Sequence, residues 1–371
     1  MTTESVADGR AAERSPPLDQ PMGPPLGPPL GVSSDRPLIG LFTAGRRPLE
    51  ALVPLRLRAL VAESVLQGAE FGLLGTADID AENRTARYLT PSGTGWRTCR
   101  GALPRVVMNP LHPATDADVA ALTLLRAAAP LTTTRLANEI GIGARLAKTS
   151  VAPHVIPFRP VPADRIGATI TRFLDKHRRA VLKPAAGRRG RGVLFLTRTA
   201  EGVALRESAT ERQLTIEALV EELRPRLAEG SWLIQRFVVS NARDGRAFDV
   251  RVHCHKDGEG RWSLVRAYVR LSEAGLLVSN TSRGGYQGDV DAFFANAGRA
   301  LADQVRQVGL ETAIALDREA DGLIDELGVD LLVDPQRHPW IIEVNTHPQS
   351  RYHELERARF AVAYALYLAR R

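Results

Sequence analysis

Apolar and polar residues alternate along two stretches of the chain, and each predicts a β-hairpin. In FDVRVHCHKDGEGRWSLVRAYVRL, every second residue is apolar on both sides of the KDGEG turn. Strict alternation gives a strand one apolar and one polar face. Matching the apolar faces gathers six polar side chains on the other face: Asp249, Arg251, His253, Arg266, Tyr268 and Arg270. We expect an anion among these arginines, and we expect His253 and His255 to face solvent.

The second hairpin is predicted in LGVDLLVDPQRHPWIIEVNTHP, where two apolar strands flank a short turn with prolines. Pairing about a centre between Gln336 and Arg337 places Asp330 opposite Glu343. Asn345, two residues further, points to the same face. Two carboxylates and an amide oxygen are hard ligands suited to magnesium. The alternative is a half-exposed hairpin with a chance acidic pair.

Earlier segments predict further units. Residues 1–36 contain SPPLDQPMGPPLGPPLG, a Pro/Gly-rich tract that cannot build a core, so a disordered tail is expected. Residues 37–133 alternate short apolar runs with helical patterns, which indicates a small α/β domain. A GxGxxG fingerprint is missing from this sequence, so dinucleotide binding is not supported.

A glycine-rich loop follows a predicted strand that carries Lys183. Its glycines are Gly187, Gly190 and Gly192. Such a loop brings backbone N–H groups close to an anion, although the spacing differs from the GxxxxGK[ST] phosphate loop. An exposed hairpin turn is the alternative, and Lys183 favours phosphate contact.

Composition narrows the function classes. The net charge is +7, yet no DNA- or RNA-binding motif appears, so a basic pocket for phosphates is preferred over nucleic acid. Only four of the 49 basic residues are lysines, which marks each as a candidate site for a compact ammonium: Lys148, Lys176, Lys183 and Lys256. No apolar run is long enough for a membrane span, and two cysteines without a motif fit a cytoplasmic location.

Four motifs, taken in order along the chain, resemble the ATP-grasp superfamily, and most closely its YheC/YheD-like, spore-coat-associated branch. They are VLKPAAGRRGRGV, FDVRVH, VSNTSRGG and ELGVDLLVD…WIIEVNTHP. The resemblance covers Leu136–Arg371. It implies an α/β (α+β) ATP-grasp fold in which a lid subdomain, 134–235, and a C-terminal subdomain, 236–371, clamp ATP. Residues 37–133 would be the preceding α/β domain, and a homodimer is implied as well.

The resemblance also implies roles for individual residues. Lys148 and Lys183 would contact the ATP phosphates, and Gly187–Gly192 would close over them. Gln235 would bind adenine through its side chain, with the backbone of Arg236 and Val238 beside it. Magnesium, or manganese, would be held by Asp330, Glu343 and Asn345. Arg251, Arg270 and Asn280 would be catalytic, with Gly284 and Gly285 nearby.

The chemistry implied is ligation of a carboxylate to an amine. ATP would phosphorylate the carboxylate, and an amine would attack the acyl phosphate, leaving ADP and phosphate; amino acids or peptides are candidate substrates. A kinase on the same scaffold and a non-catalytic spore-coat assembly protein are the alternatives.

Overall fold

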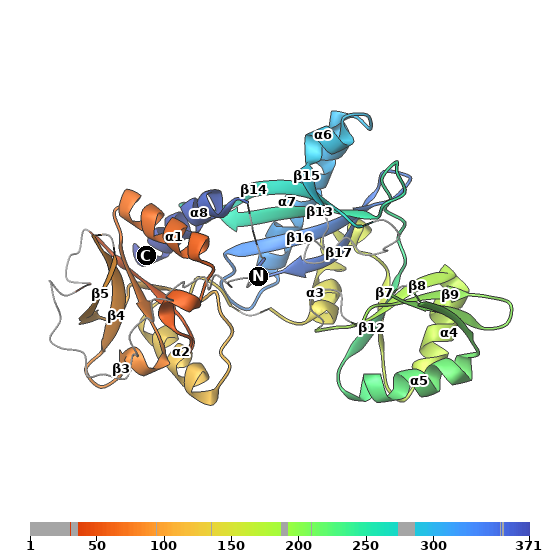
Figure 1. Cartoon of the computed structure of the whole chain (residues 1–371), viewed down its shortest axis with the longest axis horizontal. Helices are drawn as coiled ribbons and strands as arrows, with labels where there is room; N and C mark the ends of the chain where they lie inside the picture. Colours follow the sequence, from red (N-terminus) through yellow and green to blue (C-terminus); the bar gives the residue numbers. More distant parts are fainter. Residues whose placement is uncertain are drawn as a thin grey trace, which may run out of the picture.

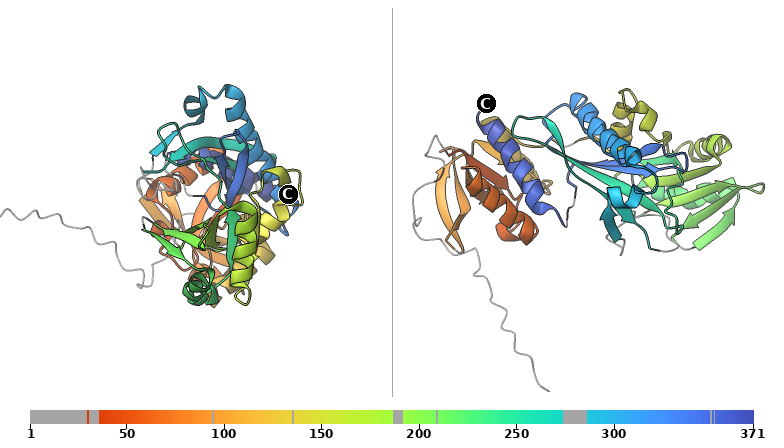
Figure 2. Two further views of the ribbon diagram at one scale, coloured as in Figure 1. Left: turned by 90° about the vertical axis from the view of Figure 1, so that its right-hand side faces the viewer. Right: turned by 90° about the horizontal axis from the view of Figure 1, so that it is seen from above.

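The computed structural model describes residues 30, 36–93, 95–134, 136–186, 192–208, 210–273, 286–348, 350 and 352–371. Within them, three β-sheets lie in a row along the long axis of the molecule, each covered by helices (Figures 1 and 2). Each sheet has its own hydrophobic core, and the N-terminal sheet has one on either face.

The N-terminal sheet has the order β3-β4-β2-β1-β6, with β5 paired to β4. β1 runs parallel to β2 and β6, whereas β4 is antiparallel to its partners. The strands are β1 (Leu38–Phe42), β2 (Glu70–Leu74), β3 (Ile79–Asp80), β4 (Thr85–Ser92), β5 (Gly95–Ala102) and β6 (Val106–Met108). Short 3-10 helices lie at η1 (Pro48–Glu50) and η2 (Thr76–Asp78).

Helices cover both faces of this sheet. α1 (Pro54–Leu66) and the C-terminal helix α8 (Glu354–Ala369) pack on one face, and α2 (Asp116–Ala128) packs on the other. Alternate residues of β1 enter the two cores, as a strand buried on both sides requires. The last helix of the chain is therefore packed against its first sheet (Figure 2).

The second sheet, β11-β10-β9-β8-β12-β7, is antiparallel. Its strands are β7 (Phe158–Val161), β8 (Arg179–Pro184), β9 (Leu194–Arg198), β10 (Val203–Glu207), β11 (Thr210–Leu214) and β12 (Trp232–Arg236). α4 (Ile166–His177) and α5 (Ile216–Ala228) cover one face of this sheet and enclose its hydrophobic core. The other face is left for the site described below.

The third sheet, β15-β14-β13-β16-β17, is also antiparallel. Its strands are β13 (Phe248–Lys256), β14 (Trp262–Leu271), β15 (Tyr286–Asp289), β16 (Glu326–Val333) and β17 (Pro339–Asn345). The accompanying helices are α3 (Glu139–Leu146), η3 (Ala152–His154), α6 (Val290–Phe294) and α7 (Arg299–Arg318).

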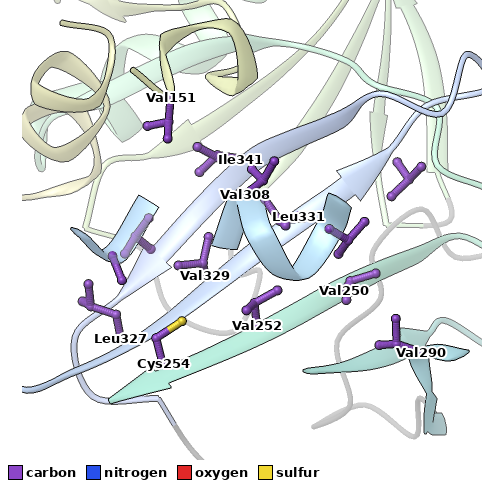
Figure 3. Packing of buried hydrophobic residues seen from close by; sticks show 14 of the residues in the cluster. Val151, Val250, Val252, Cys254, Val290, Val308, Leu327, Val329, Leu331 and Ile341 are labelled. Carbon is purple, nitrogen blue, oxygen red and sulfur yellow. The ribbon is translucent and has the colours of Figure 1, made fainter. Parts of the chain in front are cut away.

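The apolar face of this sheet is buried under α7. Val250, Val252 and Cys254 alternate into this core, together with Leu327, Val329 and Leu331 (Figure 3). α7 approaches β13 closely at Gly309, where an added Cβ would lie 2.4 Å from Val252 Cβ. Because these apolar side chains occupy one face, the polar side chains that alternate with them in β13, β14, β16 and β17 lie on the other.

None of the helices in the described part of the chain combines the length and apolar character needed to cross a bilayer.

Candidate active site

The β16–β17 hairpin places Asp330 directly opposite Glu343, as the sequence pairing predicts. The agreement depends on a β-bulge. Next to the turn, Leu331 pairs with Ile341, so Ile342 is an extra residue and the register shifts before Asp330. Without the bulge, Asp330 would face Ile342 and Glu343 would point to the other side of the sheet.

The β13–β14 hairpin also has the predicted polar face, and its register sets Asp249 opposite Arg270 and Arg251 opposite Tyr268. The anions that neutralise these arginines are side chains of the protein itself. Arg251 donates to Asp330 twice, Nε to Oδ1 at 2.5 Å and Nη2 to Oδ2 at 2.6 Å. Arg270 donates to Asp249 at 2.5 Å and lies 2.9 Å from Asp330 Oδ2.

Asn345 links Glu343 to Arg251, the partner of Asp330. In the amide orientation that satisfies both of its polar atoms, it donates to Glu343 Oε1 at 3.1 Å and accepts from Arg251 Nη2 at 3.2 Å. Asp330, Glu343 and Asn345 are therefore brought together on the polar face, beside the predicted catalytic arginine.

The two carboxylates differ in their electrostatics. Burial raises the pKa of Glu343 to about 7, and the charges of Asp330 and Glu139 add to that rise. Burial would also raise the pKa of Asp330, but Arg251 and Arg270 together lower it. Among the described residues no ion pair of Glu343 is found, and a bound cation would supply the missing positive charge.

This set of oxygens fits a magnesium ion that is shared with phosphates. No cluster of three or more His, Cys, Asp or Glu side chains able to hold a metal occurs among the described residues. Two carboxylates and an amide oxygen would leave the other positions to phosphate and water, as Mg²⁺ prefers. Asp330 would have to exchange part of its contact with the arginines to take part.

A pocket lies between the second and third sheets. Its walls are mainly apolar, from α3, β7, β12 and β17, and three polar residues line it: Gln235, Glu139 and Glu343. Gln235 is buried on β12, so its amide is positioned by the sheet. An apolar slot with one buried amide suits a planar heterocycle such as adenine.

Glu139 is a site residue that the sequence analysis missed. It lies in the first turn of α3 and forms an ion pair with Lys183 of β8. Burial raises the pKa of Glu139, against the opposing effect of Lys183. The sequence signal was slight, because only Asn138 as a helix N-cap marks this position.

The other residues predicted to contact the nucleotide differ in their burial and in their distance from the pocket. Lys148 is exposed in the turn that follows α3, and it does not line the pocket. Arg236 stacks on Trp340, 4.1 Å from the ring centre, and its backbone N–H donates to Pro157. Val238 is buried.

The predicted glycine-rich and catalytic loops lie only partly within the described residues. Gly192 has φ +73°, a conformation that favours glycine. Gly187, Gly190, Asn280, Gly284 and Gly285 lie outside the described residues.

The expectation that His253 and His255 face solvent is wrong, since both are fully buried. His253 shares the polar face with Arg251, but the first turn of α8 covers it there, and it bonds to Glu326 and His353. Strand alternation gave the face correctly and could not show that a helix from the chain end closes it.

Comparison with known proteins decides the family. The family model described as YheC/D-like ATP-grasp matches residues 130–368. The chain belongs to the YheC/D-like ATP-grasp family. The predicted ATP-grasp fold, with its mixture of helices and sheets, is thereby confirmed.

Two curated ATP-grasp relatives come from Bacillus subtilis strain 168. The endospore coat-associated protein YheD is 24% identical over 335 residues, which cover 84% of this chain and 72% of YheD. The endospore coat-associated protein YheC is 24% identical over 184 residues, covering 47% of this chain and 50% of YheC. Their names give an association with the spore coat and no reaction.

Solved ATP-grasp structures share the fold at low identity. D-alanyl-alanine synthetase A from Vibrio cholerae superposes with a TM-score of 0.58 at 10% identity, covering 90% of this chain and 99% of that one. D-cycloserine synthetase DcsG gives 0.54 at 19%, covering 89% and 98%. The ATP-grasp ligase PsnB, in a complex with a precursor variant, Mg and ADP, gives 0.51 at 13%, covering 90% and 99%. This chain therefore shares its fold with these structures.

Proposed function

We propose that this chain is an ATP- and magnesium-dependent ligase, which activates a carboxylate as an acyl phosphate and joins it to an amine, releasing ADP and phosphate. The observation that carries the proposal is the joint placement of Asp330, Glu343 and Asn345 with Arg251 and Arg270 on one polar sheet face. The pocket that contains Gln235 and Glu343 opens between this sheet and the next, where a nucleotide would reach the polar face.

The roles of the residues follow from their charges. A carboxylate that attacks a phosphate meets electrostatic repulsion, which fixed cations reduce without reorganising. Arg251 and Arg270 are nearly buried and held on adjacent strands, so their guanidinium groups are preorganised for the phosphoryl group. Lys183 would contact the ATP phosphates after exchanging Glu139 for phosphate oxygens.

Asp330, Glu343 and Asn345 would hold magnesium, or manganese. The ion would neutralise charge on the phosphates of ATP during transfer. Lys148, Gly187, Gly190, Gly192, Arg236 and Val238 remain proposed contacts to ATP, and Asn280 remains a proposed catalytic residue.

The names of the relatives favour one other function, a non-catalytic role in assembling the spore coat. An assembly role has no need of a magnesium site, whereas the described polar face retains two carboxylates, an amide and two arginines together. A kinase that phosphorylates a small molecule would use the same face and differs in its products.

Product analysis separates these functions. The purified chain is incubated with Mg-ATP and pooled amino acids or peptides, and ADP, AMP and free phosphate are followed. The ligase predicts ADP and phosphate that depend on an added carboxylate and are lost in Glu343→Gln. ADP without free phosphate would indicate a kinase. AMP with pyrophosphate, or no ATP binding, would refute the proposal.

The organisation of the chain is proposed on the same basis. Residues 1–36 would be a tail and 37–133 the domain that precedes the ATP-grasp unit, with 134–235 as lid and 236–371 as C-terminal subdomain. A homodimer and a cytoplasmic location remain proposals, and we propose no nucleic-acid partner.

A further inference from the structure

One residue of the proline-rich N-terminal tail is buried in the N-terminal sheet. Leu30 is only 6% exposed, and it belongs to the core on the α2 side of that sheet, together with Cys99. It forms a parallel β-bridge with Gly101, near the end of β5. β5 is an outer strand that pairs with β4 along its other edge, so Leu30 binds at the margin of the sheet. A leucine from a tract that cannot build its own core therefore completes the core of the N-terminal sheet.

The position of Leu30 depends on a glycine in β5. A Cβ added to Gly101 would lie 2.4 Å from the carbonyl oxygen of Leu30 and 3.1 Å from its backbone nitrogen. Only a residue without a side chain allows two backbones to approach so closely. Gly95, at the other end of the same strand, has open space where its Cβ would be. The close approach is therefore confined to the point where Leu30 meets β5.

The backbone of Leu30 also reaches the thiol of Cys99. Cys99 precedes Gly101 by two residues, so the two positions face the same side of β5. Cys99 is 1% exposed. Burial raises the pKa of its thiol, while Arg97 and a hydrogen bond from the Leu30 backbone oppose the rise. Leu30 thus lies against the sulfur of Cys99, and removing Leu30 from β5 would uncover it.

The sequence before Leu30 suits an extended ligand. Two copies of Gly-Pro-Pro-Leu follow each other in the tail and end at Leu26 and Leu30. Proline fixes its φ angle at about −65° and disfavours the helical region in the residue before it. Consecutive prolines therefore preorganise a chain and reduce the entropy that is lost when it docks. Sheet edges bind such segments through the backbone and take specificity from a side chain, which here is leucine.

We propose that the end of β5 is a docking site for a Pro-Pro-Leu segment, and that the chain occupies this site itself through Leu30. Leu30 and Leu38, the first residue of β1, share one core, and the eight residues of sequence that separate them span at most about 28 Å. A tether this short gives an effective concentration on the order of millimolar, so the tail of a second copy competes poorly. The inference does not depend on the proposed ligase, because the polar face of the third sheet takes no part in it.

The rate at which Cys99 is alkylated tests the docking site. The full-length chain is treated with iodoacetamide, and labelling of each cysteine is followed by mass spectrometry. Cys254, in the core of the third sheet, is the internal reference for unfolding. Leu30→Asp places a charge on the docked leucine. Leu26→Asp places the same charge in the preceding repeat and is the matched control.

A second pair of variants changes the strand and keeps the tail intact. Gly101→Ala adds the Cβ that obstructs the Leu30 backbone, and Gly95→Ala adds a Cβ to open space in the same strand. We expect Leu30→Asp and Gly101→Ala to label Cys99 at least about tenfold faster than the wild type. Both control variants should keep the wild-type rate, and Cys254 should remain unlabelled in all four.

Adding the segment as a separate peptide distinguishes a lost ligand from a loosened sheet. The peptide GPPLGPPLG, at millimolar concentration, should restore the protection of Cys99 in Leu30→Asp, whereas GPPDGPPDG should not. An unchanged Cys99 rate in Leu30→Asp or Gly101→Ala, or a failure of GPPLGPPLG to protect, would overturn the docking site. Docking within one chain also predicts a wild-type rate that is independent of dilution. Faster labelling on dilution would assign the bound leucine to a second copy and refute that part of the proposal.

Discussion

The burial of His253 predicts how the stability of the folded protein changes in acid. Replacing His253 by Gln keeps a side-chain N–H that can donate to Glu326, at the position of Nε2. It removes the only titrating group at that position. The variant should therefore be folded at pH 7 and should lose less stability than the wild type when the pH falls.

The magnitude follows from the displaced pKa. His253 has a pKa of about 3 in the folded protein and an ordinary value of 6.5. Between these pH values His253 is protonated in the unfolded chain and neutral in the folded chain. The contribution of neutral His253 to the free energy of unfolding is therefore complete above pH 6.5 and decreases as the pH falls. Each unit of difference is worth about 1.4 kcal/mol, which gives about 2 kcal/mol between pH 7 and pH 5.

Urea unfolding followed by tryptophan fluorescence at both pH values measures the effect. The loss of unfolding free energy from pH 7 to pH 5 should be about 2 kcal/mol smaller in His253→Gln than in the wild type. His338→Gln, in the β16–β17 turn and away from His253, Glu326 and His353, is the matched control and should keep the wild-type loss. An equal loss in wild type and His253→Gln would show that His253 is not held neutral in the folded protein.

Three further predictions concern the site and the core. Glu343→Gln should weaken magnesium-dependent ATP binding by at least about tenfold in calorimetry with an unchanged circular dichroism spectrum, because the negative charge of a proposed metal ligand is lost; unaltered affinity would remove Glu343 from the metal site. Glu139→Gln should tighten ATP binding severalfold, since the carboxylate that competes with phosphate for its lysine partner is gone; weaker binding would give Glu139 a supporting role instead. Gly309→Ala should cost about 1–3 kcal/mol in urea unfolding because α7 must move away from β13, whereas Gly230→Ala, with open space around its Cβ, should be near neutral.

The two hairpins were predictable because their information is local. Alternation fixed the polar face of β13 and β14, and the turn position fixed the pairing of Asp330 with Glu343. The bulge at Ile342 was not visible in the pattern. The predicted pairing was still correct because its centre was set half a residue beyond Gln336. This offset shifts every pair by one residue, which is the shift that the bulge produces.

The environment of these faces was not predictable, because it comes from elements far away in the chain. Glu139 reaches Lys183 across 44 residues, and α8 covers His253 from the C-terminal end. Composition marked all lysines equally, yet Lys183 lies at the site, whereas Lys148 is exposed outside the pocket lining. Strand periodicity indicates which side chains share a face of the sheet. What packs against that face depends on the tertiary structure.

The same long-range contacts explain how a strongly basic site is stable in the structure. Lys183, Arg251 and Arg270, the cations proposed to meet the phosphates, each contact a carboxylate supplied by another element. ATP binding would then be an exchange of partners, in which phosphates take the cations while magnesium takes carboxylates such as Asp330 and Glu343. Such an exchange conserves ion pairs, so its net free energy is smaller than the charges alone suggest. It also requires both halves of the exchange, which is why we expect ATP binding to depend on magnesium.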